Sequence, residues 1–199
     1  MIQQCRKILH EMKNDENEGI IEEGYLTCHK LEIACLSYLK SPVLEDRVME
    51  ILTIPPKPFT FYLDLYYLLD QLNVFLPRAK KECLRTALNY QLQTTLSMDR
   101  VLETIHGLVD VSESKQDSFH WIEQLLQITK SQGPDFKPSK ESSCYMMVMI
   151  RQMDEYAYFT SITWNHGIYY QRLNNPKDAE QFLSLAIQLL PYCGDLLKV

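Results

Sequence analysis

The stretch that decides the fold is WNHGIYYQRLNNPKDAEQFLSLAIQLLP, residues 164–191. Apolar residues recur at intervals of three and four on both sides of Asn174 and Asn175, which predicts two helices joined by a short turn. Asn175 suits a helix N-cap, Pro176 suits the first turn, and Asp178 lies near the positive end of the helix dipole. The stretch therefore predicts an antiparallel helical hairpin.

Small residues stand where the two predicted helices would touch. Gly167 in the first helix, and Ala179 and Ala186 in the second, allow the backbones to approach closely. Their order and spacing match a tetratricopeptide unit, a helical repeat of about 34 residues, although Trp164 is one position from the usual tryptophan site. The predicted repeat-packing residues are Trp164, Gly167, Tyr170, Ala179, Leu183, Ala186 and Pro191.

The same spacing of apolar residues continues through most of the chain. A total of 6 Gly and an abundance of Leu, Gln, Glu and Lys favour helices over a large sheet. Because one repeat cannot bury its apolar face alone, we predict an all-α, tetratricopeptide-like α-solenoid of antiparallel helical hairpins. The predicted helices span about 2–13, 20–39, 43–52, 59–74, 78–96, 98–109, 113–130, 144–173 and 176–190.

One segment predicts a division of the chain. Residues 131–143, SQGPDFKPSKESS, collect Gly, Pro, Ser and Lys, a composition typical of a flexible connection. We therefore predict a degenerate helical-hairpin array over 1–132, a flexible loop over 133–143, and the C-terminal helical pair over 144–199.

Charge and hydropathy exclude several classes of protein. The formal net charge of -6 opposes a basic nucleic-acid surface, so direct nucleic-acid binding is not expected. The most apolar stretch, 59–76, contains Asp64 and Asp70 and falls short of a membrane span. The chain opens on a polar helix with Arg6 and Lys7 rather than an apolar leader, so we expect a nuclear or cytoplasmic protein.

The residues also predict no catalytic, metal or cofactor site. The sequence lacks a nucleophile elbow, a phosphate-binding glycine loop, a dinucleotide fingerprint and a zincin motif. The six cysteines form no CxxC pair and are typical of reduced, buried thiols, and no two histidines have metal-ligand spacing. Cys28 adjoins His29, but neighbouring residues do not share a helix face, so we interpret Cys28 and Cys35 as core residues with Leu31.

Two features have both a structural and a binding interpretation. Tyr62, Tyr66 and Tyr67 belong to a helix that is apolar around most of its circumference, which favours a central helix packed on both sides. Alternatively, these three tyrosines form a docking surface for a partner helix. The acidic run over 11–23 is similarly explained by solvation, or by attraction of a basic partner tail.

Residues 154–191, DEYAYFTSITWNHGIYYQRLNNPKDAEQFLSLAIQLLP, resemble the meiotic sporulation-type tetratricopeptide scaffold family of the ZMM crossover group. In that family an aromatic residue, Asn and then a small residue mark one helix. Trp164, Asn165 and Gly167 stand in those places, and the alanine-bearing helix follows. Residues 1–140 resemble the family in being helical hairpins, and family members are several times longer, which implies a fragment or a short isoform.

This resemblance implies a non-catalytic scaffold that supports meiotic recombination, chromosome synapsis and crossover formation. Its partners would be other recombination and synapsis proteins, gathered on meiotic chromosomes in the nucleus. Two alternatives remain open: a helical-repeat adaptor of an unrelated cytoplasmic complex, and an enzyme that uses Cys28 or another thiol. The enzyme would require a thiol with a depressed pKa.

Overall fold

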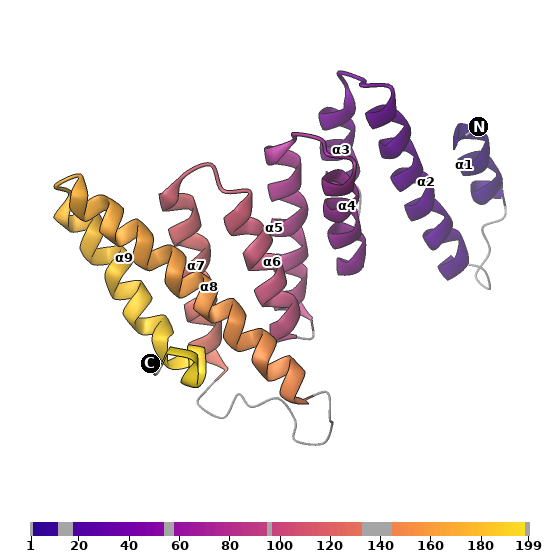
Figure 1. Ribbon diagram of the computed structural model, residues 1–199. Helices are drawn as coiled ribbons and strands as arrows, with labels where there is room; N and C mark the ends of the chain where they lie inside the picture. Colours follow the sequence, from indigo (N-terminus) through magenta and orange to yellow (C-terminus); the bar gives the residue numbers. More distant parts are fainter. Residues whose placement is uncertain (1, 12–17, 54–57, 95–96, 133–144, 198–199) are drawn as a thin grey trace. The chain divides into compact units, whose positions relative to one another are not determined.

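The computed structural model describes residues 2–11, 18–53, 58–94, 97–132 and 145–197. Within these ranges the regular structure is helical, with no strand (Figure 1). The elements are α1 (Ile2–Glu11), α2 (Glu18–Tyr38), α3 (Leu44–Thr53), α4 (Phe59–Gln71), α5 (Pro77–Gln93), α6 (Met98–Asp110), α7 (Lys115–Ser131), α8 (Tyr145–Arg172), α9 (Pro176–Leu189) and the 3-10 helix η1 (Leu190–Leu197). The all-α prediction is confirmed, and the helices begin and end within a few residues of the predicted positions.

The chain forms two compact units, Met1–Gln93 and Thr94–Val199. The first contains α1 to α5, and the second contains α6 to η1. The loop predicted over 133–143 lies outside the described residues. In the second unit, α6 and α7 pack with the C-terminal pair α8 and α9.

Three helices end in the same backbone motif. Lys40, Asn73 and Asn174 follow α2, α4 and α8 with left-handed φ angles of 50°, 50° and 55°. After each of them, an amide bonds back to a carbonyl five residues earlier, as from Asn175 to Tyr170 at 3.0 Å. This Schellman arrangement satisfies carbonyl groups at the helix end and reverses the chain, and Asn tolerates the left-handed conformation better than most residues.

In the first unit, α2 packs on α3 and α4 packs on α5, and the two pairs meet through α2 with α4 and α3 with α5. Arg47 of α3 donates to Glu32 of α2 at 3.0 Å, and Lys80 of α5 donates to Asp70 of α4 at 2.9 Å. A stripe of small residues at four-residue spacing on α5 is fully buried, which allows this helix to pack closely on its neighbour. Its members are Ala79, Cys83 and Ala87.

In the second unit, two helical hairpins lie side by side. Residues 99 and 110 of α6 bond to residues 152 and 158 of α8, at 2.6 Å and 2.7 Å, so the numbers rise together and the two helices run parallel. Residues 119 and 130 of α7 contact residues 182 and 188 of α9 in the same sense. The first helices of the two hairpins, α6 and α8, thus pack on each other, and so do the second helices, α7 and α9.

Candidate functional site

A groove runs between α2 and α4 in the first unit. Each helix presents residues at intervals of three or four along one face, which is the spacing that aligns side chains on a helix. From α2 these are Thr27, Lys30, Leu31 and Ala34, and from α4 they are Phe61, Asp64, Tyr67, Leu68 and Gln71. Space for another molecule remains between the two rows as two adjoining hollows that share Thr27, Lys30 and Asp64.

The larger hollow, of about 500 Å³, is mainly apolar. Leu31 and Ala34 of α2 face Tyr67 and Leu68 of α4 across it. Leu31 is 53% exposed and Tyr67 is 38% exposed, so both offer apolar surface to an incoming side chain. Exposed aromatic and aliphatic surface in a concave site is typical of anchor pockets at protein interfaces.

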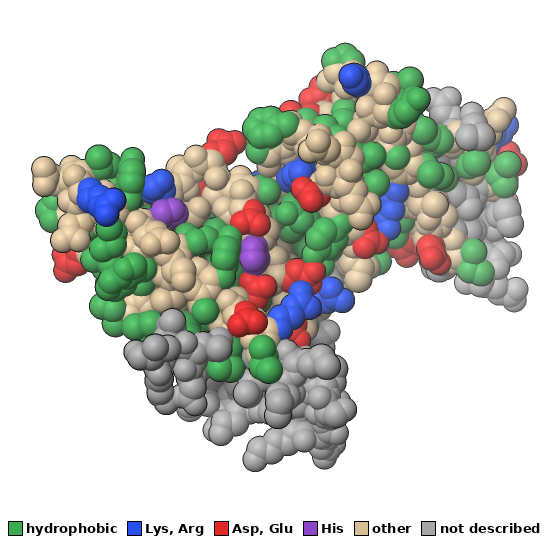
Figure 2. Space-filling view, viewed as in Figure 1, with side chains coloured by type: hydrophobic (Ala, Val, Ile, Leu, Met, Phe, Trp, Pro, Cys, Tyr) green, Lys and Arg blue, Asp and Glu red, His purple; other side chains and the backbone are tan. Residues whose placement is uncertain are grey.

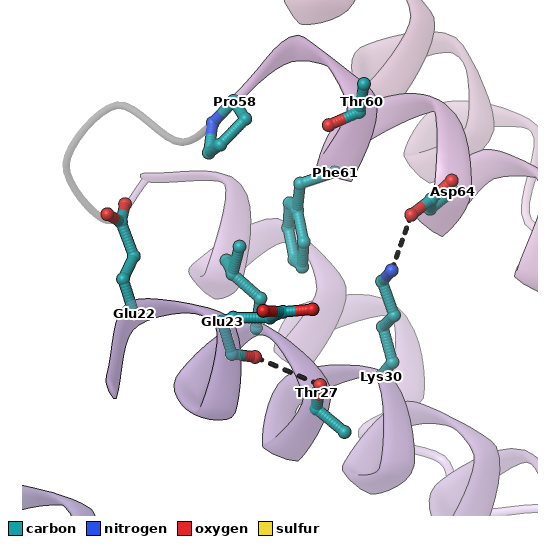
Figure 3. Close-up of a pocket in the computed structure, with 9 residues that line it drawn as sticks. Glu22, Glu23, Thr27, Lys30, Pro58, Thr60, Phe61 and Asp64 are labelled. Atoms are coloured by element: carbon teal, nitrogen blue, oxygen red, sulfur yellow. Dashed lines mark hydrogen bonds and ion pairs between the residues drawn. The ribbon is translucent and has the colours of Figure 1, made fainter. Parts of the chain in front are cut away.

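The smaller hollow, of about 310 Å³, is acidic at its rim (Figure 3). Glu22 and Glu23 line it from α2, and Asp64 lines it from α4. Thr27 donates to the backbone oxygen of Glu23 at 3.0 Å, a bond within α2. Phe61, which is buried, points from α4 toward α2 and closes the hollow on the inside (Figure 3).

An ion pair separates the two hollows. Lys30 Nζ lies 2.5 Å from Asp64 Oδ2 and 5.9 Å from the centre of the Phe61 ring. The side chains of Lys30 and Asp64 are 35% and 54% exposed, so water screens their attraction. This pair links α2 to α4 while leaving both charged groups accessible to a ligand.

The predicted docking tyrosines do not act as one surface. Tyr67 lines the apolar hollow. The Tyr66 ring lies edge-on to the Tyr67 ring, with ring centres 5.3 Å apart. Tyr62 is 3% exposed and packs against Phe61 with ring centres 5.9 Å apart, so its predicted docking role is wrong. Tyr62 and Tyr66 are four residues apart and share one face of α4, whereas Tyr67 lies about 100° further round the helix, on the face that lines the groove.

The predicted packing residues of the C-terminal pair largely meet at the α8–α9 contact. Gly167 is buried, and a Cβ atom there would lie 2.6 Å from Leu183 Cγ. Ala179 and Ala186 are buried, and Tyr170 stacks on Phe182 with ring centres 5.4 Å apart. Pro191 is exposed within η1, directly after α9 ends.

Trp164 departs from its predicted packing role. It is 48% exposed, whereas Thr163, one residue earlier, is fully buried. The one-residue offset from the usual tryptophan site turns the indole away from the core, since adjacent helical residues point about 100° apart. Figure 2 shows hydrophobic side chains on the surface of the second unit, in the region where α8 and α9 lie in Figure 1.

The Cys83 thiol does not resemble an activated nucleophile. Burial, with the charge of Glu82 adding to it, raises the pKa of Cys83 to about 12. Cys28 is 6% exposed and its neighbour His29 is also buried, so the pair belongs to the core of the first unit. Cys35 and Leu31 are exposed, so the prediction that they join Cys28 in the core is wrong. Within the described ranges, no three His, Cys, Asp or Glu side chains are arranged to hold a metal ion.

Sequence reasoning missed a polar cluster between α6 and α8. His106 Nδ1 lies 2.6 Å from Glu155 Oε2, and the His106 ring stacks on Tyr158 with centres 4.1 Å apart. Tyr158 donates to Asp110 at 2.7 Å, and burial together with this bond raises the pKa of the phenol. These residues stand nearly 50 positions apart in the sequence, so no local spacing rule could pair them; their contacts join the two hairpins.

Comparisons with family models, curated proteins and solved structures found no match. The resemblance of residues 154–191 to the meiotic scaffold family therefore stays a prediction. Among the described helices, none combines the length and the apolar character needed to cross a bilayer.

Proposed function

We propose that this protein is a non-catalytic interaction module that binds a segment of another protein in the α2–α4 groove. The observation that carries the proposal is the groove itself, with an apolar hollow and an acidic hollow joined end to end. A groove between two helices that presents exposed anchors such as Leu31 and Tyr67 suits a side-chain-bearing peptide or helix.

The arrangement of helices supports a repeat scaffold. In the second unit, first helices pack on first helices and second helices on second, as stacked hairpins of a tetratricopeptide-like α-solenoid would. Gly167 against Leu183 supplies the close approach expected of such a hairpin. We extend the proposal to meiotic chromosomes, where partners would be recombination and synapsis proteins, on the resemblance of residues 154–191.

Affinity capture with a groove variant tests this function. Leu31→Asp places a charge in the apolar hollow, whereas Asn89→Asp makes a similar change at an exposed site on α5. Each 199-residue chain would be used to capture proteins from extracts of meiotic and of non-meiotic cells. Circular dichroism would verify that both variants keep their helices.

The proposal expects partners that bind the wild type and the Asn89→Asp chain and are lost with Leu31→Asp. An identical set of captured proteins for all three chains would contradict binding in the groove. If groove-dependent partners came only from the non-meiotic extract, the proposal of an interaction module would stand. The cytoplasmic adaptor would then be favoured over the meiotic scaffold.

A further inference from the structure

The two hollows of the α2–α4 groove differ in charge. The described residues around the smaller hollow include three carboxylates, from Glu22, Glu23 and Asp64, and one ammonium group, from Lys30. The larger hollow shares Lys30 and Asp64, which neutralise each other, and is otherwise uncharged. The groove is therefore negative at one end and apolar at the other.

The spacing of the two ends follows from helix geometry. Glu23 and Leu31 are eight residues apart on the same helix, which corresponds to about 12 Å along its axis. An extended chain covers about 12 Å in roughly four residues, at about 3.3 Å per residue. A helical segment covers it in about eight residues, so that its two anchors share one face.

Building on the proposed function, we propose that the groove binds a cationic–apolar segment of a partner protein. A Lys or Arg side chain of the segment enters the acidic hollow, and an apolar side chain fills the hollow beside Leu31 and Tyr67. The charge complementarity selects a cation, because an acidic side chain would meet Glu22 and Glu23. The apolar hollow supplies an anchor that salt does not screen.

Lys30 competes with the partner's cation for the Asp64 carboxylate. Its Nζ atom already pairs with Asp64 Oδ2 at 2.5 Å, and Lys30 lines both hollows. A guanidinium group from the partner presents a planar set of donors that can bind a carboxylate with two hydrogen bonds, which Lys30 cannot do. We therefore expect Arg to be selected over Lys at the acidic end.

Selection from a random peptide library displayed on phage tests this chemistry with the 199-residue chain as bait. The charge-reversed variant is Glu22→Lys with Glu23→Lys, and the apolar variant is Leu31→Asp. The control is Asp154→Lys with Glu180→Lys, which changes the net charge equally at exposed sites in the second unit. Helical content and a cooperative thermal transition would be checked for every variant.

We expect enriched peptides to carry a cationic residue, more often Arg than Lys, at a constant spacing from an apolar residue. A selected peptide should bind the charge-reversed and Leu31→Asp chains at least about tenfold more weakly, a loss of about 1.4 kcal/mol, and the control as tightly as wild type. Its affinity should also fall with added salt.

Two results would overturn the inference. Peptides that lack a cation yet depend on Leu31 would refute the stated chemistry while leaving the groove as a binding site. If no enriched peptide depends on Leu31, Glu22 or Glu23, a cationic–apolar segment is not the ligand. Affinity capture with Leu31→Asp then decides separately whether the groove binds proteins at all.

Discussion

Position 167 shows how one hydrogen atom in place of a methyl group fixes the distance between two helices. A Cβ atom there would lie 2.6 Å and 2.7 Å from two carbon atoms of the Leu183 side chain and 3.3 Å from its backbone nitrogen. The first two distances are shorter than van der Waals contact, so either Leu183 must leave its position or α8 and α9 must move apart.

Gly167→Ala should therefore lower the free energy of unfolding. Overpacking costs about 1–3 kcal/mol, and the better helix propensity of Ala returns about 1 kcal/mol, so the net loss is about 1 kcal/mol. Urea denaturation would measure it in the wild-type and Leu183→Ala backgrounds. The loss should shrink when Leu183 is truncated; equal losses in both backgrounds would show that Leu183 is not the obstacle.

His166 makes the stability of the second unit depend on pH. Burial lowers the pKa of this imidazole below its ordinary value, and the positive charge of Lys115 adds to the effect. Its Nδ1 atom is buried and has no hydrogen-bond partner within the described part of the chain. As pH falls through about 6.5, the unfolded chain takes up a proton before the folded chain does, so acidification destabilises the fold.

His166→Gln removes this titration. Between about pH 7.5 and about pH 5.5, the melting temperature of the wild type should fall more than that of His166→Gln, because other titrating groups are common to both chains. Differential scanning fluorimetry at the two pH values would measure it. A larger fall for the variant would reverse the sign of the argument.

Individual residues were predicted less well than the face of a helix to which they belong. The sequence identified the aromatic character of α4, but the direction in which α2 lies decides that Tyr67 is accessible and Tyr62 is buried. Similarly, the motif placed Trp164 in the repeat contact, while a one-residue offset leaves it 48% exposed. Such outcomes depend on tertiary neighbours that a local pattern does not specify.

Whole helices were predicted with greater success because their signals are local. Asn175 accepts a bond from the Asp178 amide at 3.3 Å and Pro176 opens α9, as the capping pattern indicated. The 3-10 helix η1 was not predicted. It contains Gly194 at φ 59° and ψ -146°, a conformation essentially restricted to glycine, and Cys193 buried beside Thr160 at 3.3 Å.

The contact of α9 with its neighbours is open to a test with adjacent residues. Ala186 is fully buried, whereas Ile187 is 58% exposed. Ala186→Trp should lower the free energy of unfolding by about 1–3 kcal/mol or more through overpacking, and Ile187→Trp should change it by less than about 0.5 kcal/mol. Equal effects in urea denaturation would show that α9 does not bury the Ala186 face.

At the scale of the whole molecule, the chain divides between Gln93 and Thr94. The sequence pointed to a connection at residues 133–143, whose composition is typical of one but which lies outside the described residues. The composition of a segment indicates where a helix cannot continue. A compact unit is instead defined by contacts between residues that are distant in sequence, such as those of α6 with α8. The groove was also hidden from sequence, since it is formed by residues far apart in the chain, such as Lys30 and Asp64, which are 34 positions apart.

The two units should respond separately to core truncation. Both tryptophans, Trp121 and Trp164, belong to the second unit, so their fluorescence reports on that unit alone. Leu65 and Phe159 are fully buried in the first and second units, and each truncation to Ala costs about 2–5 kcal/mol. Leu65→Ala should leave the fluorescence midpoint in urea unchanged, and Phe159→Ala should lower it. Equal shifts would indicate a single cooperative unit.

The most direct test of the α2–α4 groove as a protein-binding site is photo-crosslinking from within it. A benzoylphenylalanine side chain in place of Leu31 would lie in the apolar hollow, and one in place of Asn89 would mark a surface outside it. After irradiation with extract, the groove position should form a discrete crosslinked product containing a partner peptide with Arg or Lys near the crosslink. Identical products from both positions, or none from Leu31, would contradict binding in the groove.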